Sequence, residues 1–194
     1  MLAAADFFTV EVWTAQGLVR YHVLFVLRLA TRQVHVAGII PEPHEQWMKQ
    51  MARNLTDGLE GFLVGCRYLI HDRSSLFSDG FRLVLEGAGM ESVRLPARSP
   101  NLNAFAERFV RSIKESCLDE LILIGEASLH RATSSYLRHY QQERNHQGLN
   151  PARVQSVPEV WRDQLPQAPG WNPALLLPRG GLKSCVLGFS DITA

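Results

Sequence analysis

The first forty residues constrain the fold most, because strand-like runs there are separated by short turns. Apolar and polar residues alternate over residues 6–13, with Phe8, Val10 and Val12 on one face. A second run, over residues 19–29, is apolar on both faces in its middle, as expected for a central strand covered on both sides. A third run covers residues 33–40. Since strands joined by such short turns pair antiparallel, these segments predict a three-stranded meander.

The remainder of the chain alternates between predicted helices and strands. Helices are predicted over residues 44–55, 78–86, 103–117 and 128–145, and further strands over 66–71 and 92–95. Strands followed by alternating strands and helices favour an α/β fold, a mixed five-stranded sheet with helices on both faces. We expect one domain over residues 1–150 and an appendage rich in Pro and Gly over residues 151–194.

Composition narrows the class of protein. With 194 residues, 46% of them hydrophobic, the chain has a globular composition and is long enough for one ordinary domain. The net charge of +1 argues against a wholly electrostatic nucleic-acid binder, although a local basic patch is compatible with it. Three scattered cysteines predict neither a disulfide framework nor a zinc site. Without an apolar run long enough to span a membrane, and with no signal peptide, we expect a cytoplasmic protein.

Three acidic residues have ordinary explanations when each is considered alone. Asp6 is in phase with the apolar face of its strand, but it could belong to a frayed chain start. Asp72 follows a buried strand, where it could cap the next helix or pair with Arg73. Glu107 lies on a predicted amphipathic helix, where an exposed pair with Arg111 is the simplest role. Their order is a strand acid, a strand-end acid and a helix acid, with 65 and then 34 residues between them.

This order of acids, together with the flanking sequence motifs, resembles the catalytic core of retroviral-type integrases and the related DDE insertion-sequence transposases. The resemblance covers about residues 5–150. Its matching text is Asp6 in the first strand, Asp72-Arg73-Ser74-Ser75-Leu76-Phe77, Ser99-Pro100, Asn103-Ala104, Ala106-Glu107-Arg108-Phe109-Val110, and Tyr140 with Glu143-Arg144-Asn145-His146-Gln147-Gly148-Leu149. The resemblance implies a ribonuclease-H-like fold.

The same resemblance implies a metal-dependent polynucleotidyl transferase of a mobile element, which cleaves DNA and transfers the strand. It makes Asp6, Asp72 and Glu107 both the catalytic residues and the ligands of Mg²⁺ or Mn²⁺, with two ions expected. Two ions about 3.5–4 Å apart can activate the attacking oxygen and stabilise the leaving oxygen. The implied partners are DNA, as element ends and target, and further copies of the chain. The implied location is the bacterial cytoplasm, at the nucleoid when DNA is bound.

A cluster of basic residues surrounds the third acid. Residues 94–114 contain five cationic side chains against Glu107 alone, and five minus one gives +4. Among them we expect Arg108, Arg111 and Lys114 to contact the DNA backbone. A solvated helix face is an equally good explanation for any one of these residues.

Two alternatives remain open at this point. The first is a ribonuclease-H-like nuclease, which would cut DNA without joining it. The second is a non-catalytic DNA-binding remnant of a transposase. Transposases of this type usually carry a helix-turn-helix region before the core, and this chain starts five residues before Asp6. The expectation of an enzyme therefore includes a truncated catalytic fragment.

Overall fold

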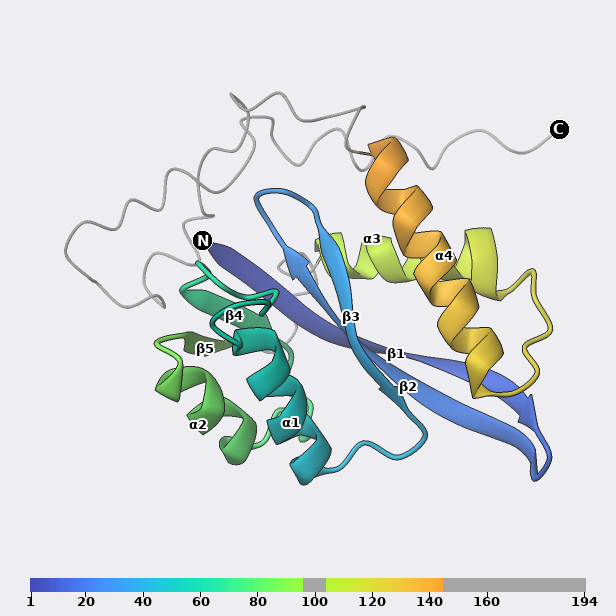
Figure 1. The fold of residues 1–194 in the computed structure, drawn as a ribbon, viewed down its shortest axis with the longest axis horizontal. Helices are drawn as coiled ribbons and strands as arrows, with labels where there is room; N and C mark the ends of the chain where they lie inside the picture. Colours follow the sequence, from blue (N-terminus) through green and yellow to red (C-terminus); the bar gives the residue numbers. More distant parts are fainter. Residues whose placement is uncertain (96–103, 145–194) are drawn as a thin grey trace, which may run out of the picture. The chain divides into compact units, whose positions relative to one another are not determined.

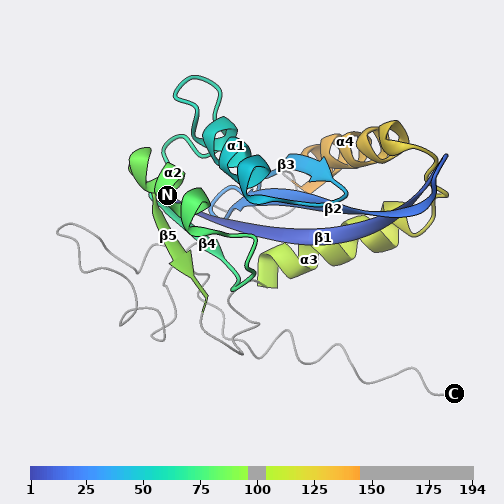
Figure 2. The ribbon, with the colours of Figure 1, turned by 90° about the horizontal axis from the view of Figure 1, so that it is seen from below.

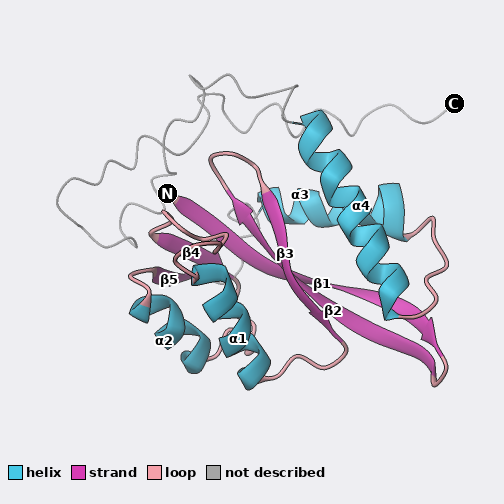
Figure 3. Cartoon of the chain, in the orientation of Figure 1, coloured by secondary structure: helices cyan, strands magenta, loops and turns pink. Residues whose placement is uncertain are grey.

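A mixed five-stranded sheet forms the centre of the computed structural model, which describes residues 1–95 and 104–144 (Figure 1). The strand order across the sheet is β3-β2-β1-β4-β5. The strand bounds are β1 (Leu2–Thr14), β2 (Gly17–Arg28), β3 (Val34–Ile40), β4 (Tyr68–His71) and β5 (Glu91–Arg94). Figure 3 shows the two long central strands, β1 and β2, crossing the molecule.

Strands β1, β2 and β3 form the predicted antiparallel meander. The turn between β1 and β2 closes where Thr14 pairs with Gly17, whose φ of 104° is a conformation that glycine adopts without steric cost. On the other side of β1, strands β4 and β5 run parallel to it. The register joins β1 to β4 from Leu2 with Tyr68 to Ala5 with His71. This parallel pairing brings together segments that are distant in the sequence.

Strand β1 begins earlier than its hydrophobic pattern predicts. The expected segment started at residue 6, whereas β1 starts at Leu2 and its first alanines, Ala3, Ala4 and Ala5, are buried. Alanine has a low strand propensity, but these residues pair with β2 on one side and β4 on the other. Tertiary pairing therefore overrides propensity. As a consequence, Asp6 lies inside a strand rather than at a frayed end.

Two hydrophobic cores cover the two faces of the sheet. The first packs α1 (Glu45–Thr56) and α2 (Asp79–Gly87) against residues such as Leu24 and Leu69. The second packs α3 (Ala104–Ile113) and α4 (Glu126–Arg144) against Phe8 and Phe25. Figure 2 shows α1 and α3 on opposite sides of the sheet. The predicted mixed five-stranded sheet with helices on both faces is confirmed.

The helix predicted over residues 103–117 is two elements. Regular helix α3 ends at Ile113, and a π-helical turn, η2 (Lys114–Leu118), follows it. Its signature is the hydrogen bond from the Asp119 N–H to the Lys114 carbonyl, at 2.9 Å. Five residues of α-helix would turn Leu118 by about 140° away from Ile113. The wider turn lets both side chains reach the core, where both are buried.

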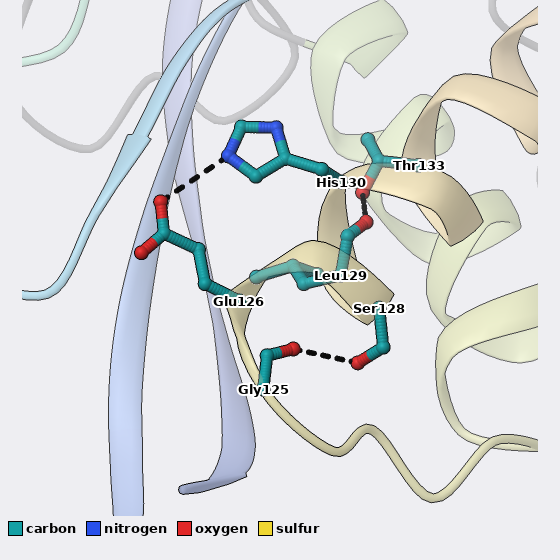
Figure 4. A network of polar contacts seen from close by, with 6 residues as sticks. All are labelled: Gly125, Glu126, Ser128, Leu129, His130 and Thr133. Atoms are coloured by element: carbon teal, nitrogen blue, oxygen red, sulfur yellow. Dashed lines mark hydrogen bonds and ion pairs between the residues drawn. The ribbon is translucent and has the colours of Figure 1, made fainter.

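Helix α4 is fixed at its N-terminal end by a small polar network (Figure 4). The Ser128 hydroxyl donates to the Gly125 carbonyl at 2.7 Å, and the buried Thr133 hydroxyl donates to the Leu129 carbonyl at 2.7 Å. The Gly125 N–H in turn donates to the Trp13 carbonyl at 2.8 Å, which ties the helix start to the end of β1. Leu129 belongs to the second core, and Ala132, Tyr136, Leu137 and Tyr140 pack against it.

Candidate metal and nucleic-acid site

Asp6 and Asp72 each come directly after the last residue pair that joins β1 to β4. The last pair in the parallel register is Ala5 with His71, and each aspartate is the next residue in its own chain segment. Adjacent strands lie about 4.8 Å apart, so extending the register by one residue places the two aspartates at neighbouring positions. Two of the three predicted acids are therefore brought together, although 65 residues separate them in the sequence.

Each aspartate also stabilises the backbone beside it. One carboxylate oxygen of Asp6 accepts the Phe7 N–H at 2.7 Å. The Asp72 side chain accepts the Ser74 N–H at 3.0 Å, which bends the chain away from the end of β4. The helix-cap explanation for Asp72 is wrong, because the residue that caps α2 is Ser78.

The alternative pairing of Asp72 with Arg73 is also not observed. The Arg73 guanidinium donates from Nε to the Leu95 carbonyl at 2.9 Å. Within the described residues, no ion pair joins Arg73 to Asp72. Arg73 therefore ties the turn after β4 to the end of β5.

His71 supports the Asp72 position from within the core. Its side chain is fully buried, its Nδ1 lies 2.7 Å from the Asp72 carbonyl, and its Nε2 lies 2.8 Å from the Ser92 hydroxyl on β5. Burial, the largest cause, lowers the pKa of the His71 imidazole. Since a carbonyl can only accept, Nδ1 carries the proton in the neutral ring, and Ser92 donates to Nε2. His71 is not among the site residues predicted from the sequence.

Glu107 lies on α3, the helix that packs against β1. Phe109, two residues after Glu107, packs against Phe8, two residues after Asp6, with ring centroids 6.5 Å apart. Two helical residues turn a side chain by about 200°, so Glu107 lies on the side of α3 away from Phe109, and it is exposed. Within residues 1–95 and 104–144, no three His, Cys, Asp or Glu side chains lie close enough together to hold a metal ion.

The expected basic residues follow Glu107 along α3 and η2. Arg108 and Arg111 are exposed, whereas Lys114 is half-buried at the start of η2. The alternative role for Glu107, an ion pair with Arg111, does not form in the described part of the chain. The Ser99-Pro100 motif and most of the motif at residues 143–149 lie outside the described residues.

The family comparison bears on the second half of this domain. Residues 88–152 match the family described as "Integrase core domain". The predicted resemblance to an integrase core is confirmed. The matched integrase-core segment contains Glu107, Arg108, Arg111 and Lys114. Asp6 and Asp72 lie before it, so their association rests on the strand register alone.

The other comparisons are with individual proteins. None of the curated proteins matches the chain. Among solved structures, this chain is similar to the catalytic core domain of BIV integrase, with 15% sequence identity and a TM-score of 0.44. That match covers 59% of this chain and 66% of the BIV chain. In the part of the chain that the structure describes, none of the helices has the length and apolar character needed to cross a membrane.

Proposed function

We propose that the chain is a metal-dependent polynucleotidyl transferase of a mobile element, which cleaves DNA and joins the cut strand to a target. One observation carries the proposal: the β1–β4 register sets Asp6 beside Asp72, on the same sheet that anchors an integrase-core helix bearing Glu107. A structural role alone does not account for two adjacent carboxylates, because like charges side by side repel each other.

The aspartate pair fits a divalent cation of the Mg²⁺ type. Mg²⁺ prefers hard oxygen ligands and keeps several waters, so one or two carboxylates together with substrate phosphates are sufficient. Asp6 and Asp72 would hold the ion, with Glu107 as the further ligand. When bound, Mg²⁺ or Mn²⁺ would polarise the phosphate and activate the attacking oxygen.

The protein's own residues then have three tasks. Strands β1 and β4 hold Ala5 and His71, the residues directly before the two aspartates, in register before any ligand binds, which would limit the backbone ordering needed on binding. Arg108 and Arg111 are exposed beside Glu107, where they would neutralise phosphates of the bound strand. His71, buried behind Asp72, holds the carbonyl of that residue in place.

The test is an activity assay on the full 194-residue chain. The chain is incubated with branched and nicked DNA oligonucleotides in Mg²⁺ or Mn²⁺, together with the variants Asp72→Asn and Glu107→Gln. Glu86→Gln, an exposed glutamate on α2, is the matched control. We expect metal-dependent cutting and joining in the wild type and the control, and a loss of roughly 100-fold or more in the two site variants.

The products decide between this proposal and its alternatives. Joined strands support a transferase, whereas cut strands without joined products support a ribonuclease-H-like nuclease. If Asp72→Asn keeps the wild-type activity, Asp72 is not required for catalysis and the proposed site is wrong. A wild-type chain that binds DNA but neither cuts nor joins it would support the non-catalytic remnant.

A further inference from the structure

The end of the β1–β2 hairpin carries a row of exposed apolar side chains. Trp13 and Leu18 pair across the hairpin and are 55% and 50% exposed. A third residue extends the row, because Trp13 and Ile124 form a parallel bridge in which the Trp13 N–H donates to the Leu123 carbonyl at 2.9 Å. Bridged residues direct their side chains to the same face of a sheet, so Leu18, Trp13 and Ile124 form one row.

The segment before α4 alternates between the core and this exposed row. Leu123 is buried in the second core, whereas its neighbours Ile122 and Ile124 are 82% and 72% exposed. An extended segment with one face on the core normally has polar residues at its outward positions. Both outward positions here are isoleucines, and together with Trp13 they line one open cavity of about 610 Å³. Exposed apolar residues that are contiguous in this way mark an interaction surface.

This hairpin surface, formed by Trp13, Leu18, Ile122 and Ile124, lies away from the helices that cover the same face of the sheet. The odd-numbered residues of β1 share that face, and near the start of the strand Ala5 and Phe7 pack with α1 and α2. Figures 1 and 2 show both helices near the start of β1, at the opposite end from the hairpin turn. The exposed fractions of the four side chains show that no described element covers them.

The next row along the hairpin is an ion pair on the same face. Arg20 Nη2 lies 3.1 Å from Glu11 Oε1, and both side chains are exposed. Two such faces can meet about a twofold axis that runs along the hairpin between β1 and β2. Trp13 then faces Leu18 of the second copy, and Glu11 faces Arg20 of the second copy. The hairpin face is therefore complementary to itself, as a twofold interface requires.

We propose that the hairpin surface binds a second copy of this chain, face to face, in a twofold-symmetric dimer. A second copy supplies both complementary charges by symmetry, which is why we assign it as the occupant. Stacked sheets pack about 10 Å apart, which brings the facing side chains into contact. Burial of Trp13 and Leu18 from both copies stabilises the dimer, and the ion pairs between copies fix its orientation. The inference does not depend on the proposed function, because it uses no residue of the metal site.

The test is the oligomeric state of the full 194-residue chain in EDTA, without DNA. Sedimentation equilibrium at micromolar concentrations should show a reversible dimer. Leu18→Gln should raise the dimer Kd by about 10-fold or more, because each dimer loses two buried leucines. Leu83→Gln changes an exposed leucine on α2, so it is the matched control and should leave the Kd unchanged.

A charge exchange separates contacts between copies from contacts within one copy. Glu11→Arg gives a hairpin face with two cations, and Arg20→Glu gives a face with two anions. Each variant alone should dimerise about 10-fold more weakly than the wild type, because like charges then face each other. An equimolar mixture of the two variants should form a heterodimer, since each cation then faces an anion of the other copy. The ion pair within the hairpin stays broken in the mixture, so recovery can arise only between copies.

Three results would overturn the inference. The first is a wild-type chain that stays monomeric at every concentration. The second is a Leu18→Gln variant that is folded by circular dichroism and keeps the wild-type Kd, which would mean that the dimer uses another face. The third is a mixture of the two charge variants that dimerises no better than either alone. None of these results bears on the cutting and joining of DNA, which the activity assay tests separately.

Discussion

Asp6 and Asp72 are adjacent because each comes directly after the last paired residues, Ala5 and His71, of two parallel strands. The relative position of these two residues is therefore set by the backbone register and does not depend on side-chain rotamers. A one-residue slip of β4 along β1 would separate the two carboxylates. It would also turn the side chains of β4 to the opposite face of the sheet. The buried core residues of β4, such as Leu69, prevent that slip.

The aspartate pair predicts a stabilising effect of divalent cations on the free protein. Without a metal, the two carboxylates repel each other, so Mn²⁺ should raise the melting temperature of the wild type by a few degrees through preferential binding to the folded state. Asp72→Asn keeps an oxygen for the Ser74 N–H but loses the charge. We expect this variant to melt at or above the wild-type temperature in EDTA and to show no Mn²⁺ shift in scanning calorimetry. An equal Mn²⁺ shift in both proteins would contradict the predicted ligand.

Removal of the His71 side chain should destabilise the end of β4. His71→Ala leaves a cavity and frees both the Asp72 carbonyl and the Ser92 hydroxyl, which should lower the free energy of unfolding by about 2–4 kcal/mol. Ser92→Ala should cost about 1 kcal/mol. Because the two residues share a hydrogen bond, urea unfolding of the double variant should show less than the sum of the single effects. Additive losses would indicate that this hydrogen bond contributes nothing.

Gly38 on β3 marks a close contact with α1. A Cβ added there would lie 2.6 Å from the Met51 sulfur and 2.7 Å from Cζ2 of Trp47. Gly38→Ala should therefore lower the free energy of unfolding by about 1–2 kcal/mol, as overpacking does elsewhere. Gly87→Ala is the matched control, because a Cβ there meets no atom within 4 Å. Denaturant titration should show the control to be neutral or slightly stabilised, and an equal loss in both would refute the packing argument.

The buried thiol of Cys66 predicts a loss of stability at alkaline pH. Burial raises the pKa of Cys66 above its ordinary value of 9.0, against a smaller lowering by Arg28. Above pH 9 the unfolded chain releases this proton while the folded chain keeps it, so stability must fall as the pH rises towards the folded pKa. The difference in unfolding free energy between pH 8 and pH 10 should be smaller for Cys66→Ala than for the wild type. Equal differences would show that Cys66 does not titrate differently on folding.

Most elements of the fold could be predicted from hydrophobic periodicity. The three-stranded meander and the helices over 45–56 and 79–87 agree with the expected segments to within a few residues. The π-helical turn could not be predicted. A regular helix would place Cys117 on its apolar face, and the wider turn places Leu118 there instead, so the hydrophobic pattern is compatible with both. The start of β1 could not be predicted either, since an alanine run carries no strand signal before its partners are known.

The candidate site could be predicted in part. Asp6 and Asp72 each follow the last residue pair of the β1–β4 register, and their roles as catalytic residues and metal ligands stay predictions. The roles of Glu107 and of the basic residues after it stay predictions. The contact of the Arg32 guanidinium with the ring of Phe105, 73 positions later in the chain, carries no signal in the sequence. Such a contact is visible only in three dimensions.

The parallel pairing of β1 with β4 also bears on how the protein acquires its site during folding. The β1–β2 hairpin closes over a two-residue turn and can form rapidly. The β1–β4 pairing instead requires 65 intervening residues, with β2, β3 and α1 among them, to be gathered first. We therefore expect partly folded chains on the ribosome to carry the hairpin but not the aspartate pair. A nascent chain of this kind would have no metal-binding pair until β4 has emerged.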